Sequence, residues 1–402
     1  MCQNTTTIAA GSAKLYMPET ATPAWATLDT AEKATLERQV HRLRTRIAQA
    51  GGALSFAEFM EGALYDPEIG YYSHRTVFGA AGDFITAPAL SPLFGQCLAR
   101  QCAQILRQTP GPIIEVGGGG GRLAVDILQA LDALGISPMR YVLIERSARR
   151  REEARILMAR EIPEHADRIV ITDAWPAMDA SVILANELLD ALPVTRFRVH
   201  QGQAHPLLVC AESDAFDWRE GPADAQVTEA LATRGWPEGY TSEISWAARK
   251  WIGEAATRLN AGGLLLVIDY GFPAPEFYHP QRHEGTLMCH FRHHAHGDPL
   301  VLMGLQDITT HVDFTALAES GQAAGLAVAG YTSQAAFLLS LGLAPRAQGP
   351  GRAHMEEANA IKRLTLPHEM GELFKVMAFT RGDTAPLAGF HLLDRSRALA
   401  RR

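Results

Sequence analysis

The most informative segment of the chain is Ile113-Ile-Glu-Val-Gly117-Gly-Gly-Gly-Gly121, in which an apolar strand runs directly into five glycines. The next stretch predicts an amphipathic helix, because apolar residues recur at helical spacing at Leu123, Ile127, Leu128 and Leu131. Glycines let the backbone turn sharply and approach a ligand closely, and the following helix offers unpaired N–H groups. The order of strand, glycine loop and helix therefore favours a nucleotide-like ligand on an α/β fold.

Further apolar runs bounded by turn residues predict four more strands, at residues 141–144, 168–171, 181–185 and 263–268. Helical stretches separate them, as a parallel, doubly wound sheet requires. Two later runs, 326–331 and 374–380, are candidates for the far edge of this sheet. Between the fourth and fifth strands, residues 194–199 and 206–210 predict a hairpin, so an insertion decorates the sheet.

The composition is that of a globular protein. Hydrophobic residues make up 47% and charged residues 20% of 402 residues, which excludes a disordered or fibrous chain. The net charge of −7 supplies no general attraction to phosphate backbones, so we expect no nucleic acid partner. The longest strongly apolar stretch, near residues 264–268, is too short for a membrane span. The five cysteines are scattered and never spaced Cys-x-x-Cys, which indicates reduced thiols.

Two carboxylates flank the glycine loop. Glu115 precedes the turn, where a negative charge would sit badly beside a pyrophosphate but suits a sulfonium and an ammonium group. Glu145 ends the second strand, where it can accept hydrogen bonds from both ribose hydroxyls. The first residue favours S-adenosylmethionine, whereas a nicotinamide cofactor would use the second equally well. The alternatives are that Glu115 braces the loop and that Glu145 is a solvated charge paired with nearby arginines.

Several blocks of the sequence, in this order, resemble the MidA family, whose mitochondrial members are protein-arginine methyltransferases that assist assembly of respiratory complex I. The blocks are Tyr65-Asp-Pro-Glu-Ile-Gly-Tyr-Tyr72, Gly82-Asp-Phe-Ile-Thr-Ala-Pro88, the glycine loop, Ala185-Asn-Glu-Leu-Leu-Asp-Ala-Leu-Pro-Val194, Asp269-Tyr-Gly271, Gly285-Thr-Leu287, Asp307-Ile-Thr-Thr-His-Val-Asp-Phe314 and Met370-Gly-Glu-Leu-Phe-Lys-Val376. The resemblance implies a class I methyltransferase fold, a Rossmann-like sheet of seven strands with an antiparallel end, and S-adenosyl-L-methionine as cofactor.

The resemblance also implies an organisation of the chain. We expect residues 1–29 to form a mobile arm and residues 30–108 a helical module with a segment that covers the cofactor. Residues 109–402 would form the methyltransferase core, with insertions near 194–245 and 272–312. No secretory signal is predicted, because Lys14 is the only basic residue before Lys33. The expected location is the cytoplasm for a bacterial source and the mitochondrial matrix for a eukaryotic one.

The site residues follow partly from the resemblance and partly from the sheet. By resemblance, Asp83 and Thr86 cover the cofactor pocket, although Asp83 could instead cap a turn. The cofactor set is completed by Glu115, Gly117, Gly119, Gly121, Glu145 and Asn186. Asn186 ends the fourth strand, so Glu187 and Asp190 should lie at the ligand-binding carboxyl edge of the sheet. The alternative is that Asp190 caps a short helix and Glu187 is a surface charge.

Methyl transfer to nitrogen is an in-line displacement that depends on holding the acceptor at near-attack distance. Two carboxylates can grip two nitrogens of a guanidinium and leave the third available to attack, which makes Glu187 and Asp190 the catalytic candidates. We assign Asp269, Tyr270 and His311 to substrate binding. The proton acceptor stays open among Asp83, Asp269 and His311.

The segment from residue 279 to residue 296 contains six histidines and Cys289. Their spacing matches no metal motif, so we predict no metal there. The resemblance implies that this segment lies near the polypeptide substrate. Two other functions remain open: a nicotinamide-dependent dehydrogenase, and a non-catalytic assembly chaperone that keeps the fold. The sequence identifies neither the substrate protein nor the oligomeric state.

Overall fold

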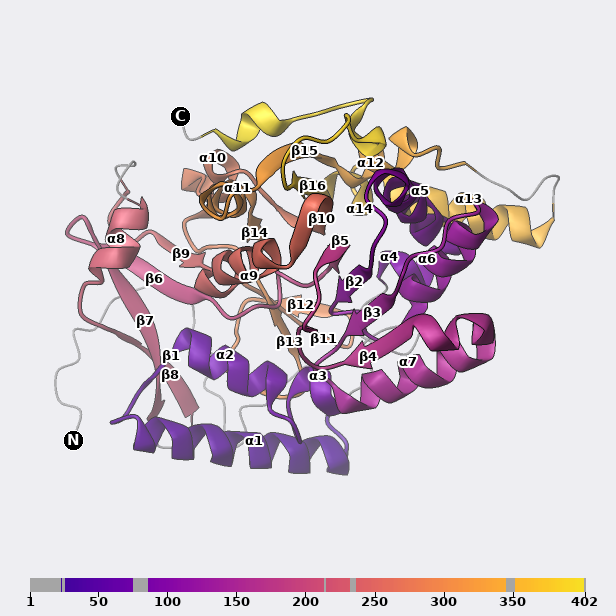
Figure 1. The fold of residues 1–402 in the computed structure, drawn as a ribbon. Coiled ribbons are helices and arrows are strands. Elements are labelled where there is room, and N and C mark those ends of the chain that lie inside the picture. The colour runs from indigo at the N-terminus through magenta and orange to yellow at the C-terminus, as the bar shows by residue number, and fades with distance from the viewer. Residues whose placement is uncertain are drawn as a thin grey trace.

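The computed structural model describes residues 23, 26–74, 86–212, 215–231, 236–344 and 351–400. Its centre is a sheet of eight strands in the order β15-β16-β10-β5-β2-β3-β4, with β14 paired to β10 (Figure 1). The strands are β2 (Ile113–Val116), β3 (Tyr141–Ile144), β4 (Ile169–Thr172), β5 (Ala180–Asn186), β10 (Leu259–Phe272), β14 (Val312–Asp313), β15 (Ala327–Ser333) and β16 (Phe374–Thr380).

Strand direction confirms the predicted fold class. β4, β3, β2, β5 and β10 run parallel to one another, whereas β16 is antiparallel to both β10 and β15. The path of seven strands with an antiparallel end is therefore the one that the sequence predicted. Each predicted strand lies within one observed strand or overlaps it with a shift of a single residue at the boundary.

Helices cover both faces of this sheet, because the strands are buried on both sides (Figure 1). Ile113 belongs to the core beneath α5 (Pro92–Gln108), α6 (Arg122–Ala133) and α7 (Ala148–Glu161). Its neighbour Ile114 belongs to the opposite core, beneath α9 (Trp246–Thr257) and α11 (Phe314–Ala323). Burying each such side chain contributes about 1.5–3 kcal/mol, so a charged residue at either position would destabilise the sheet.

The insertions form two small sheets of their own. The predicted hairpin is confirmed as β6 (Thr195–His200) and β7 (Gln203–Glu212), which pair antiparallel. β1 (Leu54–Ser55), β8 (Ala215–Glu220) and β9 (Thr241–Ile244) complete that sheet, and α8 (Ala225–Leu231) packs on β7. The second insertion contains α10 (Ala274–Phe277) and a three-stranded sheet of β11 (Met288–Phe291), β12 (His294–His296) and β13 (Asp307–Thr309).

Two capped helices begin the described part of the chain. α1 (Thr30–Gln49) starts with a capping box of Asp29 and Glu32, and α2 (Phe56–Tyr65) starts with one of Ser55 and Glu58. Their apolar faces share one core with the inserted sheets, in which Phe59 and Val209 are fully buried. The N-terminal helices are therefore anchored on the insertions, while α5 packs on the central sheet.

The shorter elements complete the structure. They are α3 (Tyr71–His74), α4 (Ala87–Leu90), α12 (Gln334–Ser340), α13 (Arg352–Thr365), α14 (Met370–Leu373) and the 3-10 helices η1 (Pro163–Arg168), η2 (Pro280–Arg282), η3 (Ala388–Phe390) and η4 (Ser396–Leu399). Among the described residues, no helix is both long enough and apolar enough to cross a membrane.

Candidate active site

The carboxyl ends of four parallel strands meet at one edge of the central sheet. β2 ends at the glycine loop and β3 at Glu145, while β5 and β10 carry Glu187 and Asp269 where they reach the same edge. In the register of β5 and β10, Asn186 lies beside Ile268. The fold therefore brings the predicted cofactor residues and the predicted acceptor residues to neighbouring positions.

The glycine loop needs its glycines. Gly117, Gly119 and Gly121 have φ values of 74°, 54° and 82°, a left-handed backbone that other residues adopt at a cost. A side chain at Gly117 would come within 2.9 Å of Leu188, whereas one at Gly119 would meet only Arg150 Nη1, at 3.6 Å. The loop is thus packed tightly at Gly117 and open at Gly119, where a ligand can approach the backbone.

Glu145 is bound to this loop. Its Oε2 accepts a hydrogen bond from Gly119 N at 3.1 Å, and its Oε1 accepts one from Ser147 N at 2.8 Å. The neighbouring Arg146 pairs with Glu61 at 2.6 Å. Glu145 is thereby fixed beside the open part of the loop, and its contact with a ribose stays a prediction.

Glu115 lies beneath the loop. It is 3% exposed, and its Oε2 accepts a hydrogen bond from the Tyr141 hydroxyl at 2.7 Å. Burial raises the pKa of Glu115 to about 8. The side chain therefore holds a proton at neutral pH in the absence of a cation, and its predicted contact with the cofactor remains untested.

Glu187 occupies a sharp turn at the end of β5. Its φ is 51°, which costs a non-glycine residue about 1–2 kcal/mol, and its N–H donates to Ile268 O at 2.9 Å. Its Oε1 accepts hydrogen bonds from Asn186 Nδ2 at 3.1 Å and from Ala87 N at 3.4 Å. Asn186 Oδ1 is buried and has no hydrogen-bond partner in the described part of the chain. This open acceptor beside Glu187 can serve a ligand.

The predicted covering segment reaches this turn. Thr86 directly precedes Ala87, and its side chain does not cap α4. Because Ala87 N donates to Glu187, Thr86 directly precedes a residue that contacts the Glu187 carboxylate. Asp83 lies outside the described residues. The cofactor roles of both residues stay predictions.

Asp190 is buried rather than a helix cap. The residue is 7% exposed, and its carboxylate accepts a hydrogen bond from Tyr270. The chain from residue 187 to residue 192 forms no helix that Asp190 could cap. Asp269 is fully buried, and its Oδ2 accepts hydrogen bonds from Leu189 N at 2.9 Å and from Asp190 N at 3.2 Å. Its other oxygen accepts Tyr270 N at 2.9 Å. Asp269 therefore fixes the turn that carries Asp190.

Three carboxyl groups are consequently crowded together. Burial and the charge of Asp190 raise the pKa of Glu187 to about 7, and burial raises the pKa of Asp190 to about 6. Burial and the same neighbours raise the pKa of Asp269 well above its usual value. Such a cluster favours a cationic ligand, because a bound cation would relieve the repulsion.

His311 packs against Tyr270 and Phe272. Its ring stacks on Phe272 with centroids 5.1 Å apart and meets Tyr270 edge-on at the same distance. Burial lowers the pKa of His311 to about 4, so the imidazole is neutral at pH 7. Its Nδ1 is buried and has no hydrogen-bond partner among the described residues. Thr310 N donates to Asp190 O at 2.9 Å, which connects this segment to the turn that carries Asp190.

Sequence reasoning missed Glu243, a buried residue of β9. Its Oε2 accepts hydrogen bonds from Thr286 N at 2.8 Å and Thr286 Oγ1 at 3.2 Å, and Thr286 Oγ1 accepts His311 N at 3.2 Å. A side chain at Gly285 would collide with this carboxylate at 2.2 Å. The Gly285-Thr286 block is therefore explained by Glu243, but the strand that carries Glu243 has no sequence signal.

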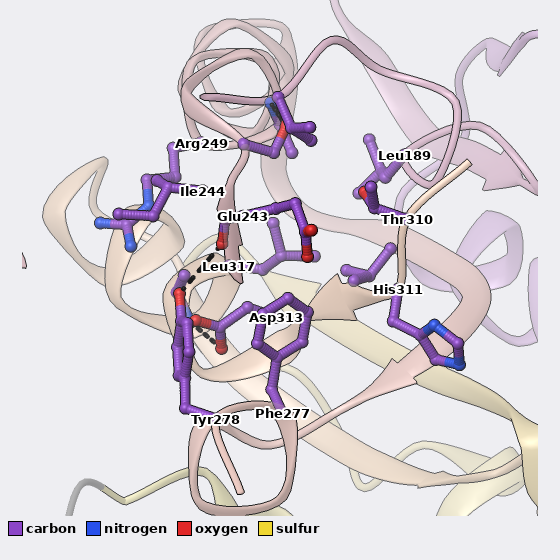
Figure 2. A pocket seen from close by; sticks show the side chains of 15 residues that line it. Leu189, Glu243, Ile244, Arg249, Phe277, Tyr278, Thr310, His311, Asp313 and Leu317 are labelled. Atoms are coloured by element: carbon purple, nitrogen blue, oxygen red, sulfur yellow. Dashed lines mark hydrogen bonds between the residues drawn. The ribbon is translucent and has the colours of Figure 1, made fainter. Parts of the chain in front are cut away.

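Glu243 also borders a small cavity. Figure 2 shows Phe277 and Tyr278 around it, with the His311 ring directed away from it. Its volume of about 20 Å³ holds one water molecule. It is too small for a cofactor, so it belongs to the packing behind the site.

One group of potential metal ligands lies elsewhere. Asp132, Glu164 and His165 place ligand atoms within 4.8 Å of one another at the end of α6 and in η1, and the two acidic residues are exposed. Within the described ranges, the histidines of residues 279–296 belong to no such group. The structure adds no support for a metal in that segment.

Comparison with known sequences gives consistent matches. A family described as "Putative S-adenosyl-L-methionine-dependent methyltransferase" matches residues 97–332. A Drosophila melanogaster protein named protein arginine methyltransferase NDUFAF7 homolog, mitochondrial, is 28% identical over 397 residues, covering 87% of each chain. The human protein named protein arginine methyltransferase NDUFAF7, mitochondrial, is 27% identical over 367 residues, covering 81% of this chain and 80% of the relative.

A solved structure matches the whole architecture. It is a Burkholderia thailandensis protein crystallised with bound S-adenosyl-homocysteine, 40% identical to this chain, with a TM-score of 0.88. The match covers 92% of this chain and 99% of that protein. The fold described above, insertions included, is thus shared with a protein that binds the demethylated form of S-adenosylmethionine.

Proposed function

The chain belongs to this family of S-adenosyl-L-methionine-dependent methyltransferases, and we propose that within it the protein is a protein-arginine N-methyltransferase. The observation that carries the proposal is the cluster of Glu187, Asp190 and Asp269 at the carboxyl edge of the sheet. The names of the Drosophila and human relatives support the same acceptor. The family assignment also sets aside the nicotinamide-dependent dehydrogenase.

The residues present fit the cofactor. The backbone of the loop is open at Gly119, Glu145 is fixed beside it, and Asn186 offers a buried acceptor without a partner in the described part of the chain. We assign the ribose to Glu145 and the methionine end to the loop and Asn186. When bound, S-adenosylmethionine supplies an electrophilic methyl group on a sulfonium.

The acceptor would be held by Glu187 with help from Asp190. A guanidinium stays protonated at neutral pH, so ionised carboxylates can hold two of its nitrogens by charge-assisted hydrogen bonds. The third nitrogen is then free to form the bond to the methyl carbon in line with the breaking carbon–sulfur bond. Asn186 and Ala87 orient Glu187, and Tyr270 orients Asp190, so that both carboxylates are placed before the acceptor arrives.

The methylated nitrogen must release a proton. Asp269 already uses both oxygens for backbone N–H groups, which makes it a poor acceptor for that proton. His311 Nδ1 has no hydrogen-bond partner among the described residues, so His311 is the better placed of the two, while its pKa of about 4 makes it a weak base. Asp83, the third candidate, lies outside the described residues.

The experiment that tests the proposed function is tandem mass spectrometry of proteins from cells with and without this protein, beginning with respiratory complex I subunits. We expect one arginine to lose its methyl group when the protein is absent. Methylation found only on lysine, oxygen or a small molecule would contradict the proposal. A Glu187→Gln variant that fails to methylate but restores complex I assembly would favour the chaperone function instead.

The mitochondrial matrix is the proposed location if the source is eukaryotic, and the cytoplasm if it is bacterial. The names of the Drosophila and human relatives describe those proteins as mitochondrial. The partner is a protein that presents an arginine to the carboxyl edge of the sheet. The insertions, which carry the histidine-rich segment 279–296, are the proposed surface for that partner.

A further inference from the structure

The block from Tyr65 to Tyr72 connects two parts of the site, and the proposed function gives it no role. Tyr65 ends α2, and its hydroxyl donates to Ala191 O at 2.9 Å. Ala191 directly follows the acceptor residue Asp190. The Tyr65 hydroxyl therefore holds the acceptor turn at a different residue from those that Asp269 contacts.

The acceptor turn is held by three elements. Asp269 of β10 accepts Asp190 N at 3.2 Å, and Thr310, which follows β13, donates to Asp190 O at 2.9 Å. Tyr65 of α2 supplies the third contact, to Ala191 O. Removing one of these contacts should loosen the turn without dismantling the sheet, because the other two remain.

The ring of Tyr65 also touches the cofactor side. The guanidinium carbon of Arg146 lies 4.4 Å from the centroid of this ring, in a cation–π arrangement. Arg146 follows Glu145, and Arg151 Nη1 donates to the carbonyl oxygens of both residues at 2.8 Å. Glu61 pairs with Arg146 at 2.6 Å and fixes its direction. A shift of the Glu145 backbone would therefore move Arg146, whose guanidinium lies over the Tyr65 ring.

Tyr72 provides a contrast within the same block. Its ring stacks on Tyr65 with centroids 5.4 Å apart, but its hydroxyl donates to Asp307 Oδ1 at 2.7 Å. Asp307 begins β13 and lies outside the acceptor turn. The two tyrosines share their surroundings and differ in which segment their hydroxyl groups hold.

We infer that Tyr65 is a positioning residue that fixes the acceptor turn and, through Arg146 on its ring, couples that turn to ligand binding at Glu145. The inference rests on the proposed function for the roles of Glu145 and Asp190. It predicts that a ligand on the cofactor side orders residues 187–192, although those residues belong to the acceptor side.

The test is hydrogen–deuterium exchange of the peptide covering residues 187–192, with and without S-adenosyl-homocysteine. In the wild-type protein the ligand should slow exchange there. Tyr65→Phe should speed exchange about tenfold, the effect of losing one hydrogen bond, and should abolish the response to the ligand. Its dissociation constant for S-adenosyl-homocysteine should stay within about threefold of wild type, because the lost bond touches no cofactor residue. Tyr72→Phe is the matched control and should behave as wild type.

Arg146→Met tests the coupling separately, because it keeps an apolar side chain on the ring and removes the charge at a half-exposed site. Exchange without ligand should stay near wild type, and the slowing by S-adenosyl-homocysteine should disappear. An unchanged response in Arg146→Met, or a Tyr65→Phe protein that behaves as Tyr72→Phe does, would overturn the inference.

Kinetics add a second readout. With an arginine-containing acceptor, Tyr65→Phe should lower kcat/KM for the acceptor about tenfold at an unchanged KM for S-adenosylmethionine. Equal losses for both substrates would overturn the positioning role. If the wild-type protein methylates no arginine, the proposed function fails, and the exchange experiment still decides on Tyr65 because it uses only S-adenosyl-homocysteine.

Discussion

The proposed cofactor side and the proposed acceptor side of this site are built in different ways. The cofactor side comes from one contiguous strand, loop and helix, with Glu145 bonded to the loop backbone. The acceptor side collects Glu187, Asp269 and Thr310 from three separate segments. On the first side Glu145 is satisfied by backbone N–H groups. On the second side burial raises the pKa of Glu187 and Asp190, and for Glu187 the charge of Asp190 adds to the effect.

This difference separates two tasks. A preformed loop can bind the cofactor whether or not the acceptor is present. A carboxylate cluster gains its charge-balancing partner only when a cation binds. We therefore expect it to contribute mainly to binding the cationic acceptor and to stabilising the transition state. Substitutions on the two sides should therefore damage different steps.

The largest effect is expected for Glu187→Gln. Gln keeps an oxygen for Asn186 and Ala87 but removes the charge that grips the acceptor, so methyl transfer should fall about 10²–10³-fold. The rate of methyl transfer to an arginine-containing protein, followed by mass spectrometry, checks this. Glu153→Gln, which removes an exposed carboxylate of α7, is the control. Full transfer by Glu187→Gln would show that the acceptor pocket is elsewhere.

A smaller effect, on the opposite side, is expected for Gly119→Val. A branched side chain at a φ of 54° is strained, and it would project into the space open to the ligand. The KM for S-adenosylmethionine should rise about 10–100-fold in a protein that remains folded. Gly120→Ala is the control, because a methyl group there meets nothing closer than 3.9 Å. Normal cofactor kinetics in Gly119→Val would remove the loop from the site.

The acceptor side should also make the reaction pH-dependent. Glu187 and Asp190, with pKa values raised to about 7 and about 6, must be ionised to grip a cation. Methyl transfer at low acceptor concentration should therefore rise about 100-fold per pH unit well below pH 6, where both groups are protonated, and about tenfold per unit between pH 6 and pH 7. It should level off above pH 7. A rate profile between pH 5 and pH 9 checks this, with S-adenosyl-homocysteine titrated over the same range. A flat profile would show that these carboxylates do not bind the acceptor in their charged form.

The same pKa shift has a consequence for stability. A carboxyl group that binds its proton more tightly in the folded state stabilises the fold below its unfolded pKa of 4.5, and this contribution is lost as pH rises through about 7. In the ligand-free Glu187→Gln protein this position cannot ionise. The unfolding free energy of the variant minus that of wild type should therefore be roughly 1–3 kcal/mol larger at pH 8 than at pH 5. Urea denaturation at both pH values measures this difference, and an equal difference at both would contradict the raised pKa.

The smallest effect is expected for a residue on neither side. Asp313 caps α11 by accepting Ala316 N at 3.1 Å, so Asp313→Ala should lower the free energy of unfolding by about 1 kcal/mol. The cofactor KM and the rate of methyl transfer should not change. Thermal unfolding and the same kinetic assay check this, and a large loss of activity would mean that the α11 cap supports the chemistry.

Much of this molecule could be predicted from its sequence, because local patterns determine local structure. The glycine loop, the parallel strands and the hairpin carry short-range signals, and each was found within one residue or inside the observed element. The carboxyl edge then followed from the rule that parallel strands end together, which placed Glu187 and Asp190 at that edge.

What the sequence could not predict are contacts made across long separations. Glu243 meets Thr286, and Tyr65 meets Ala191, through packing between an insertion or an N-terminal helix and the core. Neither Glu243 nor Tyr65 stands at a spacing that indicates its partner. The raised pKa of Glu187 likewise depends on burial, which no local pattern of residues encodes.

The separation of the two sides is tested most directly by calorimetric titration of S-adenosyl-homocysteine into Glu187→Gln and Gly119→Val side by side. We expect a dissociation constant within about threefold of wild type for Glu187→Gln and one about 10–100-fold weaker for Gly119→Val. Equal losses in both variants, or a loss confined to Glu187→Gln, would contradict the assignment of the loop to the cofactor and of the carboxylate cluster to the acceptor.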